Sequence, residues 1–299
     1  MAYEINTTRG RYVMRLTSAR PATDARFEEA LLGHLDEHAL PVAQLMKTPE
    51  NSSHAISKTV ELSLFQNVPG RPLAVFEVAP EHTRQVGAFL AAMHLTTRNF
   101  QRVRRNHTSP SHVSRTLERL LKRPLPDAID RDARTLGYEL VGHLTPRRCL
   151  PKGVVHGDLF IGHARFDHGE LRSVLGFGGA ASGVLAFDLA VALVDWGFSL
   201  DKLQVERAAA LVAGYESLRP LEAVERGGLF ELACFAATRC AIMHMAAFEI
   251  GPRTVPSRYR DYRHFMRRLS ELRSLGAQHF RDRIFGRAAR ERYSEHRSR

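Results

Sequence analysis

The fold of this chain is decided by residues 153–198, GVVHGDLFIGHARFDHGELRSVLGFGGAASGVLAFDLAVALVDWGF. The apolar pair at 154–155 is typical of the end of a buried strand, and His156 and Asp158 follow it within three residues. A second apolar run at 171–177 predicts a further strand, and an apolar helical pattern closes the stretch. We therefore expect a strand, a loop that carries an aspartate, a hairpin and a buried helix.

This layout is typical of phosphoryl transfer. An aspartate after a strand orients the attacking hydroxyl, an amide a turn later holds a metal ion, and a second aspartate at the end of the next hairpin holds the metal on the nucleotide phosphates. The expected pattern is H-x-D-x-x-x-x-N followed by a strand that ends in D-F. The sequence supplies His156 and Asp158, but His163 stands where the asparagine is expected, and Gly176 precedes Phe177 where the second aspartate is expected.

The chain resembles the aminoglycoside phosphotransferase and choline kinase superfamily, and within it the kinase-like bacterial homoserine kinases. The likeness runs from about residue 3 to about residue 272. The phrases that carry it are HGDLF at 156–160, FDLA at 187–190, DW at 195–196, AGY at 213–215, RPL at 219–221 and AFLAAMH at 88–94.

The resemblance implies an α+β, bilobal protein-kinase-like fold. Residues 1–78 would form a small β-rich lobe, and residues 79–275 a large, mostly helical lobe that contains the catalytic-loop region 153–198. Residues 276–299 read as a basic C-terminal tail. The implied cofactors are ATP and Mg²⁺, and the implied partner is a small hydroxyl substrate such as homoserine.

The resemblance also implies roles for single residues. Asp158 would be the catalytic base, and His156 would support the catalytic loop. Asp188 is expected to be a structural acid that ties the following helix to this loop. Arg239 lies in a nearly all-apolar helical segment, and a buried charge needs a partner. Either Asp195 or Asp188 could supply it.

The two metal positions depart from the family pattern. Glycine has no side chain with which to coordinate magnesium, and histidine prefers softer metals than this oxygen-seeking ion. We therefore expect no metal site at His163 and Gly176, and an activity that is impaired or absent. The alternative is a pseudokinase that keeps the fold as a nucleotide-binding or partner-binding module.

Residues 2–17 read as a hairpin, which the resemblance makes the second and third strands of the small lobe. A further strand and a glycine loop would precede it, so we expect this lobe to be truncated. Arg15 takes the place of the phosphate-pairing lysine, as a nucleotide contact or as an exposed strand arginine. Helical spacing predicts a helix at 21–37. Glu28 and Glu29 lie in its first turns, and one of them could pair with the third-strand basic residue, but we favour a solvated acidic first turn.

The connection between the lobes is expected near Phe76 and Val78. Residues 73–78 read as a strand that leads to a hinge, and in the family the hinge backbone binds the adenine. We therefore take Phe76 and Val78 as candidate nucleotide contacts.

Composition narrows the class of protein. The 299 residues are 44% hydrophobic and 25% charged, as in ordinary globular proteins, and no apolar run approaches the ~20 residues of a membrane span. These features predict a cytoplasmic protein without a membrane partner. The net charge of +11 raises the question of nucleic acid. The arginines are spread along the chain without a recognised binding motif, so we expect solvated helical faces and no nucleic-acid partner.

Overall fold

The computed structural model describes residues 2–18, 21–57, 60–66, 68–143, 150–249 and 261–286. The small lobe is an antiparallel sheet in the order β1-β2-β5-β3, with β4 paired to β5. Its strands are β1 (Ala2–Thr7), β2 (Gly10–Ser18), β3 (Gln44–Leu45), β4 (Ala55–Ser57) and β5 (Val60–Gln66). The hairpin predicted at 2–17 is therefore confirmed.

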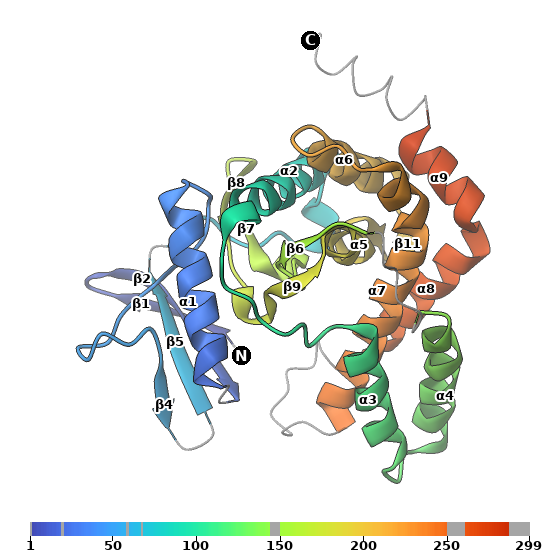
Figure 1. Cartoon of the computed structure of the whole chain (residues 1–299), viewed down its shortest axis with the longest axis horizontal. Helices are drawn as coiled ribbons and strands as arrows, with labels where there is room; N and C mark the ends of the chain where they lie inside the picture. Colours follow the sequence, from blue (N-terminus) through green and yellow to red (C-terminus); the bar gives the residue numbers. More distant parts are fainter. Residues whose placement is uncertain are drawn as a thin grey trace.

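Helix α1 (Ala22–Glu37) packs beside this sheet (Figure 1). Pro21 precedes it, and proline fits the start of a helix because its missing N–H would have no helical partner there. Leu31 and Leu35 recur at helical spacing and are fully buried, and Val13 and Phe65 of the sheet belong to the same core. The helix expected at 21–37 is confirmed.

The prediction of a strand at 73–78 is wrong. The structure has a short 3₁₀ helix at Val75–Glu77 instead. Glu77 accepts a hydrogen bond from the Ala74 N–H at 2.7 Å and pairs with Arg71 at 2.6 Å, and these bonds curl the backbone locally. Extended pairing is therefore replaced by a tight turn, which leads at once into helix α2.

The large lobe is mostly helical, and Figure 1 shows its helices gathered around α5 and α7. The helices are α2 (Pro80–Thr96), α3 (Pro110–Leu121), α4 (Asp127–Val141), α5 (Leu185–Trp196), α6 (Val205–Glu216), α7 (Ala223–Glu249), α8 (Arg263–Leu275) and α9 (Ala277–Phe285). Three two-stranded ribbons accompany them: β6 (Lys152–Val155) with β9 (Ala181–Val184), β7 (Ala164–Asp167) with β8 (Glu170–Val174), and β10 (Phe198–Ser199) with β11 (Lys202–Leu203). The predicted two-lobed α+β architecture is confirmed.

Close packing of α2 on α6 depends on two glycines. A Cβ on Gly87 would lie 1.9 Å from the carbonyl oxygen of Leu211, and a Cβ on Gly214 would lie 2.0 Å from that of Arg84. The two backbones therefore touch where any side chain would hold them apart. Helix α2 ends at the catalytic-loop region through His94, so this contact also fixes one wall of the site.

Helix α7 forms the centre of the large lobe. Within the described residues it is long and apolar enough to cross a membrane, but 83% of its most apolar window is buried inside the protein. Its place in the core accounts for this composition.

The first part of the tail expected at 276–299 is a helix. Residues 277–285 form α9, in which Phe280 and Ile284 are buried against the lobe, and Phe280 contacts Phe230 of α7 edge to face. Phe280 and Ile284 have helical spacing, but their neighbours are mostly charged, and the sequence reasoning did not recognise a helix there. Residues 287–299 lie outside the described part of the chain.

Candidate active site

The loop after β6 is held by one buried carboxylate. Asp188, near the start of α5, accepts hydrogen bonds from the backbone N–H groups of His156 and Gly157, both at 2.7 Å. His94 at the end of α2 adds a third contact at 3.1 Å, and its other ring nitrogen lies 2.8 Å from the hydroxyl of Tyr215. Burial opposes ionisation of Asp188, but the His94 hydrogen bond and the neighbouring groups outweigh it, so the pKa of this carboxyl lies below its usual value.

His156 is fully buried and directs its ring into the protein. Its Nε2 lies 2.8 Å from the carbonyl oxygen of Leu175, and its Nδ1 accepts a hydrogen bond from the Asp158 N–H at 3.2 Å. Burial lowers the pKa of the imidazole, and the two contacts assign its proton to Nε2. A neutral His156 therefore joins the catalytic loop to the end of β8.

Asp158 is the acidic side chain of this loop that faces solvent, with 40% of its side chain exposed. The guanidinium of Arg239, on α7, lies 3.7 Å from its Oδ1. The same guanidinium donates to the Gly157 carbonyl oxygen at 2.8 Å and contacts the Cys240 sulfur. Burial acts to lower the pKa of Arg239, but Cys240 and Asp158 reverse the effect, so it remains charged.

The partner of Arg239 is therefore neither of the two acids expected from the sequence. Asp188 is used by the loop backbone, as described above. Asp195 accepts a hydrogen bond from the Ile161 N–H at 2.9 Å and pairs with Arg268 of α8 at 3.0 Å. Asp158 is close to Arg239 because the long helix α7 passes directly beneath the catalytic loop, which helical spacing alone does not reveal.

The two expected metal positions do lie together. Gly176 has a positive φ of 89°, and the His163 ring packs against it. The Nδ1 of His163 contacts the Asp158 carbonyl oxygen at 2.6 Å and lies 3.8 Å from its Oδ2. Among the described residues, no group of three or more histidine, cysteine, aspartate or glutamate side chains could hold a metal ion. Neither position supplies the side-chain oxygen that magnesium prefers, so these two residues do not fit the metal ligands of the kinase pattern.

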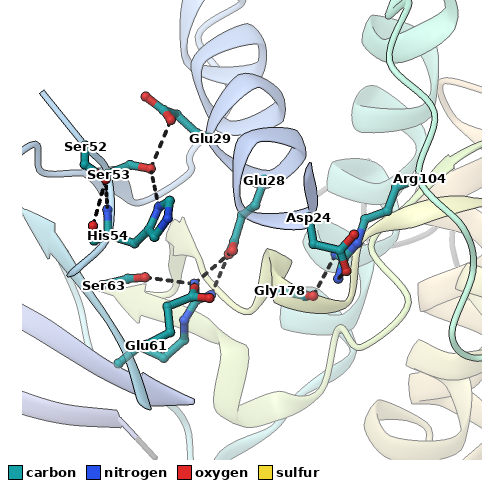
Figure 2. A network of polar contacts seen from close by, with 11 residues as sticks. Asp24, Glu28, Glu29, Ser52, Ser53, His54, Glu61, Ser63, Arg104 and Gly178 are labelled. Atoms are coloured by element: carbon teal, nitrogen blue, oxygen red, sulfur yellow. Dashed lines mark hydrogen bonds and ion pairs between the residues drawn. The ribbon is translucent and has the colours of Figure 1, made fainter. Parts of the chain in front are cut away.

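Arg15 of β2 is held by acids within the small lobe. It makes two hydrogen bonds to Glu28 of α1, at 2.5 and 2.8 Å, and lies 4.0 Å from Glu61 and 3.2 Å from Ser63. Figure 2 shows Glu28 pointing toward Glu61 and Ser63. The solvated turn that we favoured for Glu28 is wrong, since this residue is 1% exposed. The helix turns it toward the sheet, where the strand arginine compensates its charge.

A contact missed by the sequence reasoning joins α1 to the loop after Gly176. Arg104 donates to the Asp24 carboxylate at 2.8 Å and to the carbonyl oxygens of Gly178 and Ala180 at 2.8 and 2.9 Å. Figure 2 shows Asp24 facing Arg104, with Gly178 beside them. One buried guanidinium thus connects the two lobes. Its run of neighbouring arginines offered no signal by which to single it out.

The two candidate hinge contacts differ in exposure. Phe76, within the 3₁₀ helix, is 85% exposed, and Val78, which caps the end of this helix, is 3% exposed. A cavity of about 760 Å³ lies away from them against α1, lined in part by Glu29, His34 and Arg102. Asp158 does not line this cavity.

Comparisons with known proteins agree with this geometry. The model of the phosphotransferase enzyme family matches residues 2–221. A homoserine kinase of Methylobacterium radiotolerans is 32% identical, over 89% of this chain and 83% of the relative. A homoserine kinase of Phenylobacterium zucineum is 31% identical, over 90% and 84%.

Solved structures show the same fold at low identity. An amicoumacin kinase in complex with AMP-PNP and Ca²⁺ has a TM-score of 0.67 and 17% identity, covering 91% of this chain and 85% of its own. A choline kinase from Cryptosporidium parvum has a TM-score of 0.62 and 9% identity, covering 94% and 91%. These neighbours confirm the kinase-like fold. The family match over residues 2–221 and the homoserine kinase relatives show that the chain belongs to the phosphotransferase enzyme family, as a homoserine-kinase-like member.

Proposed function

We propose that the chain is a homoserine-kinase-type phosphotransferase for small hydroxyl compounds in which phosphoryl transfer is impaired. Its relatives named homoserine kinase support the substrate class. The observation that carries the impairment is the His163 ring, which packs against Gly176 where the family pattern has two metal ligands. Electrostatic stabilisation is usually the largest single contribution to catalysis, so losing the positive charge of the metal ion lowers the rate of phosphoryl transfer.

The remaining residues support the handling of a hydroxyl group. Asp158 is exposed at the end of the loop, and its carboxylate can accept the hydroxyl proton of a bound alcohol. Asp188 and His156 hold this loop from beneath through the hydrogen bonds described above. Arg239 keeps the carboxylate in one orientation. These contacts position the base.

A pseudokinase is the second candidate, and the ion pairs favour it. Arg15, which stands at the phosphate-pairing position, faces both Glu28 and Glu61. Glu28 accepts from both terminal nitrogens of the Arg15 guanidinium, so this group is less available to a nucleotide phosphate. On this alternative the cleft keeps its shape as a binding module. In both cases we place the protein in the cytoplasm, without a nucleic-acid partner.

The test is ATP turnover with homoserine and Mg²⁺, with Asp158→Asn as the matched control. The impaired enzyme gives turnover well below the roughly 1–100 s⁻¹ typical of kinases, and Asp158→Asn abolishes it. Turnover within that range contradicts the impairment. Turnover no higher than that of the folded Asp158→Asn control favours the pseudokinase.

A further inference from the structure

The space beside Gly176 is filled by another side chain. A Cβ built on Gly176 would lie 2.8 Å from both Cγ and Nδ1 of His163, and 3.0 Å from its Cδ2. These atoms include the root of the ring, so rotation about its outer bond does not clear them. A side chain at position 176 therefore requires the whole imidazole to leave.

The imidazole is held where it stands. Its Nδ1 contacts the Asp158 carbonyl oxygen at 2.6 Å, and its ring lies nearly parallel to that of Phe160, with 20° between their planes. The Leu175 N–H also donates to the His163 carbonyl oxygen at 2.8 Å. Moving the ring would cost the hydrogen bond to Asp158 and the contact with Phe160, while the backbone bond to Leu175 fixes the main chain that carries the ring.

The positive charge of the site comes from a side chain. Arg239 is 4% exposed and lies 3.7 Å from the Asp158 carboxylate. A buried charge is expensive to desolvate, and it is repaid here by the Gly157 carbonyl oxygen and by Asp158. The Asp158 carboxylate, whose Oδ2 lies 3.8 Å from Nδ1 of His163, is therefore already partly neutralised.

We propose that this site excludes a divalent cation, because His163 occupies the side-chain space of residue 176 and Arg239 supplies the charge beside Asp158. The inference rests on the proposed function, whose site it describes. On this inference, the histidine at 163 and the glycine at 176 depend on each other, because the histidine ring fits only when residue 176 has no side chain. Restoring an aspartate at 176 alone would fail because the ring is in the way, and replacing His163 alone would leave one ligand missing.

The double variant is structurally feasible. Asparagine has counterparts of the three crowding atoms, so it clears the space beside residue 176 only by turning about its Cα–Cβ bond; its side chain has no ring stacked on Phe160 to oppose that rotation. The φ of 89° at Gly176 strains most residues, but aspartate is among the few that visit the left-handed region. The coupled change therefore has a sterically open route back.

The experiment measures the affinity of a fluorescent ATP analogue in excess Mg²⁺ and in EDTA, without turnover. Four proteins are compared: wild type, Gly176→Asp, His163→Asn and the double variant. We expect Mg²⁺ to change the affinity by no more than about twofold in the first three, and to tighten it about tenfold or more in the double variant, as restored ligands do. Mn²⁺ binding followed by electron paramagnetic resonance gives a second readout.

Each outcome has a defined meaning. A wild type whose nucleotide affinity rises about tenfold with Mg²⁺ overturns the inference. So does Gly176→Asp if it gains as much as the double variant, because the ring would then be no obstacle. A folded double variant without Mg²⁺ dependence also overturns it. The proposed function fails separately, in the turnover assay, so the two failures are distinguishable.

Discussion

The substitution Asp188→Asn should destabilise the whole protein, because one buried carboxylate holds the catalytic loop. Asp188 accepts from the His156 and Gly157 N–H groups and contacts His94. An asparagine offers one carbonyl oxygen to these groups and turns its NH₂ toward another donor. At least one buried N–H then loses its acceptor, and the charge that compensates the surrounding groups disappears.

The expected cost follows from burial. Asp188 is 0% exposed, and removing one partner of a buried charged network costs about 3–5 kcal/mol. At about 2 °C for each kcal/mol, this lowers the midpoint of thermal unfolding by about 6–10 °C. Urea unfolding gives the free energy, and hydrogen exchange at residues 156–158 should rise because the loop loses its anchor.

Asp167→Asn is the matched control. It makes the same chemical change at the tip of the β7–β8 hairpin, where the side chain is 50% exposed. We expect its free energy of unfolding to stay within about 0.5 kcal/mol of wild type. The reasoning is refuted if Asp188→Asn costs less than about 1 kcal/mol, or no more than this control.

Three further outcomes can be checked. Gly87→Ala should cost about 1–3 kcal/mol or more in thermal unfolding because its Cβ meets the Leu211 carbonyl oxygen, whereas Gly33→Ala, with open space around it in α1, should be neutral or stabilising. Arg104→Lys should raise hydrogen exchange at 176–182 but not in α9, because a lysine ammonium cannot reach Asp24 and the Gly178 and Ala180 carbonyl oxygens together. Unchanged exchange at 176–182 would contradict the bridge between the lobes. Burial lowers the pKa of His244 from 6.5 to about 4, so protonation of this histidine favours the unfolded chain. Its contribution to the free energy of unfolding is complete above about pH 6.5 and is lost as the pH falls. The loss amounts to about 2 kcal/mol at pH 5. His244→Gln should remove that part of the difference between urea unfolding at pH 7 and pH 5, and equal pH dependence in both proteins would count against it.

The sequence by itself determined the local elements and the family. The hairpin at 2–17, helix α1 and the strand before Asp158 follow from apolar periodicity and turn residues, which act over a few neighbouring positions. The motif HGDLF and the later FDLA also located the loop and the helix that anchors it. Local patterns failed where a short-range contact overrode them, as when Glu77 curled residues 75–77 into a 3₁₀ turn.

Only the tertiary structure decided which charges meet. The pairs Arg15–Glu28 and Arg239–Asp158 join residues 13 and 81 positions apart. The sequence favoured a solvated Glu28, and it left two other acids open as the partner of Arg239. The sequence also recorded the substitutions at 163 and 176 without showing that one ring fills the other's space. The energy of an ion pair or a steric contact depends on separation in space and on burial, and the packing of distant helices sets both.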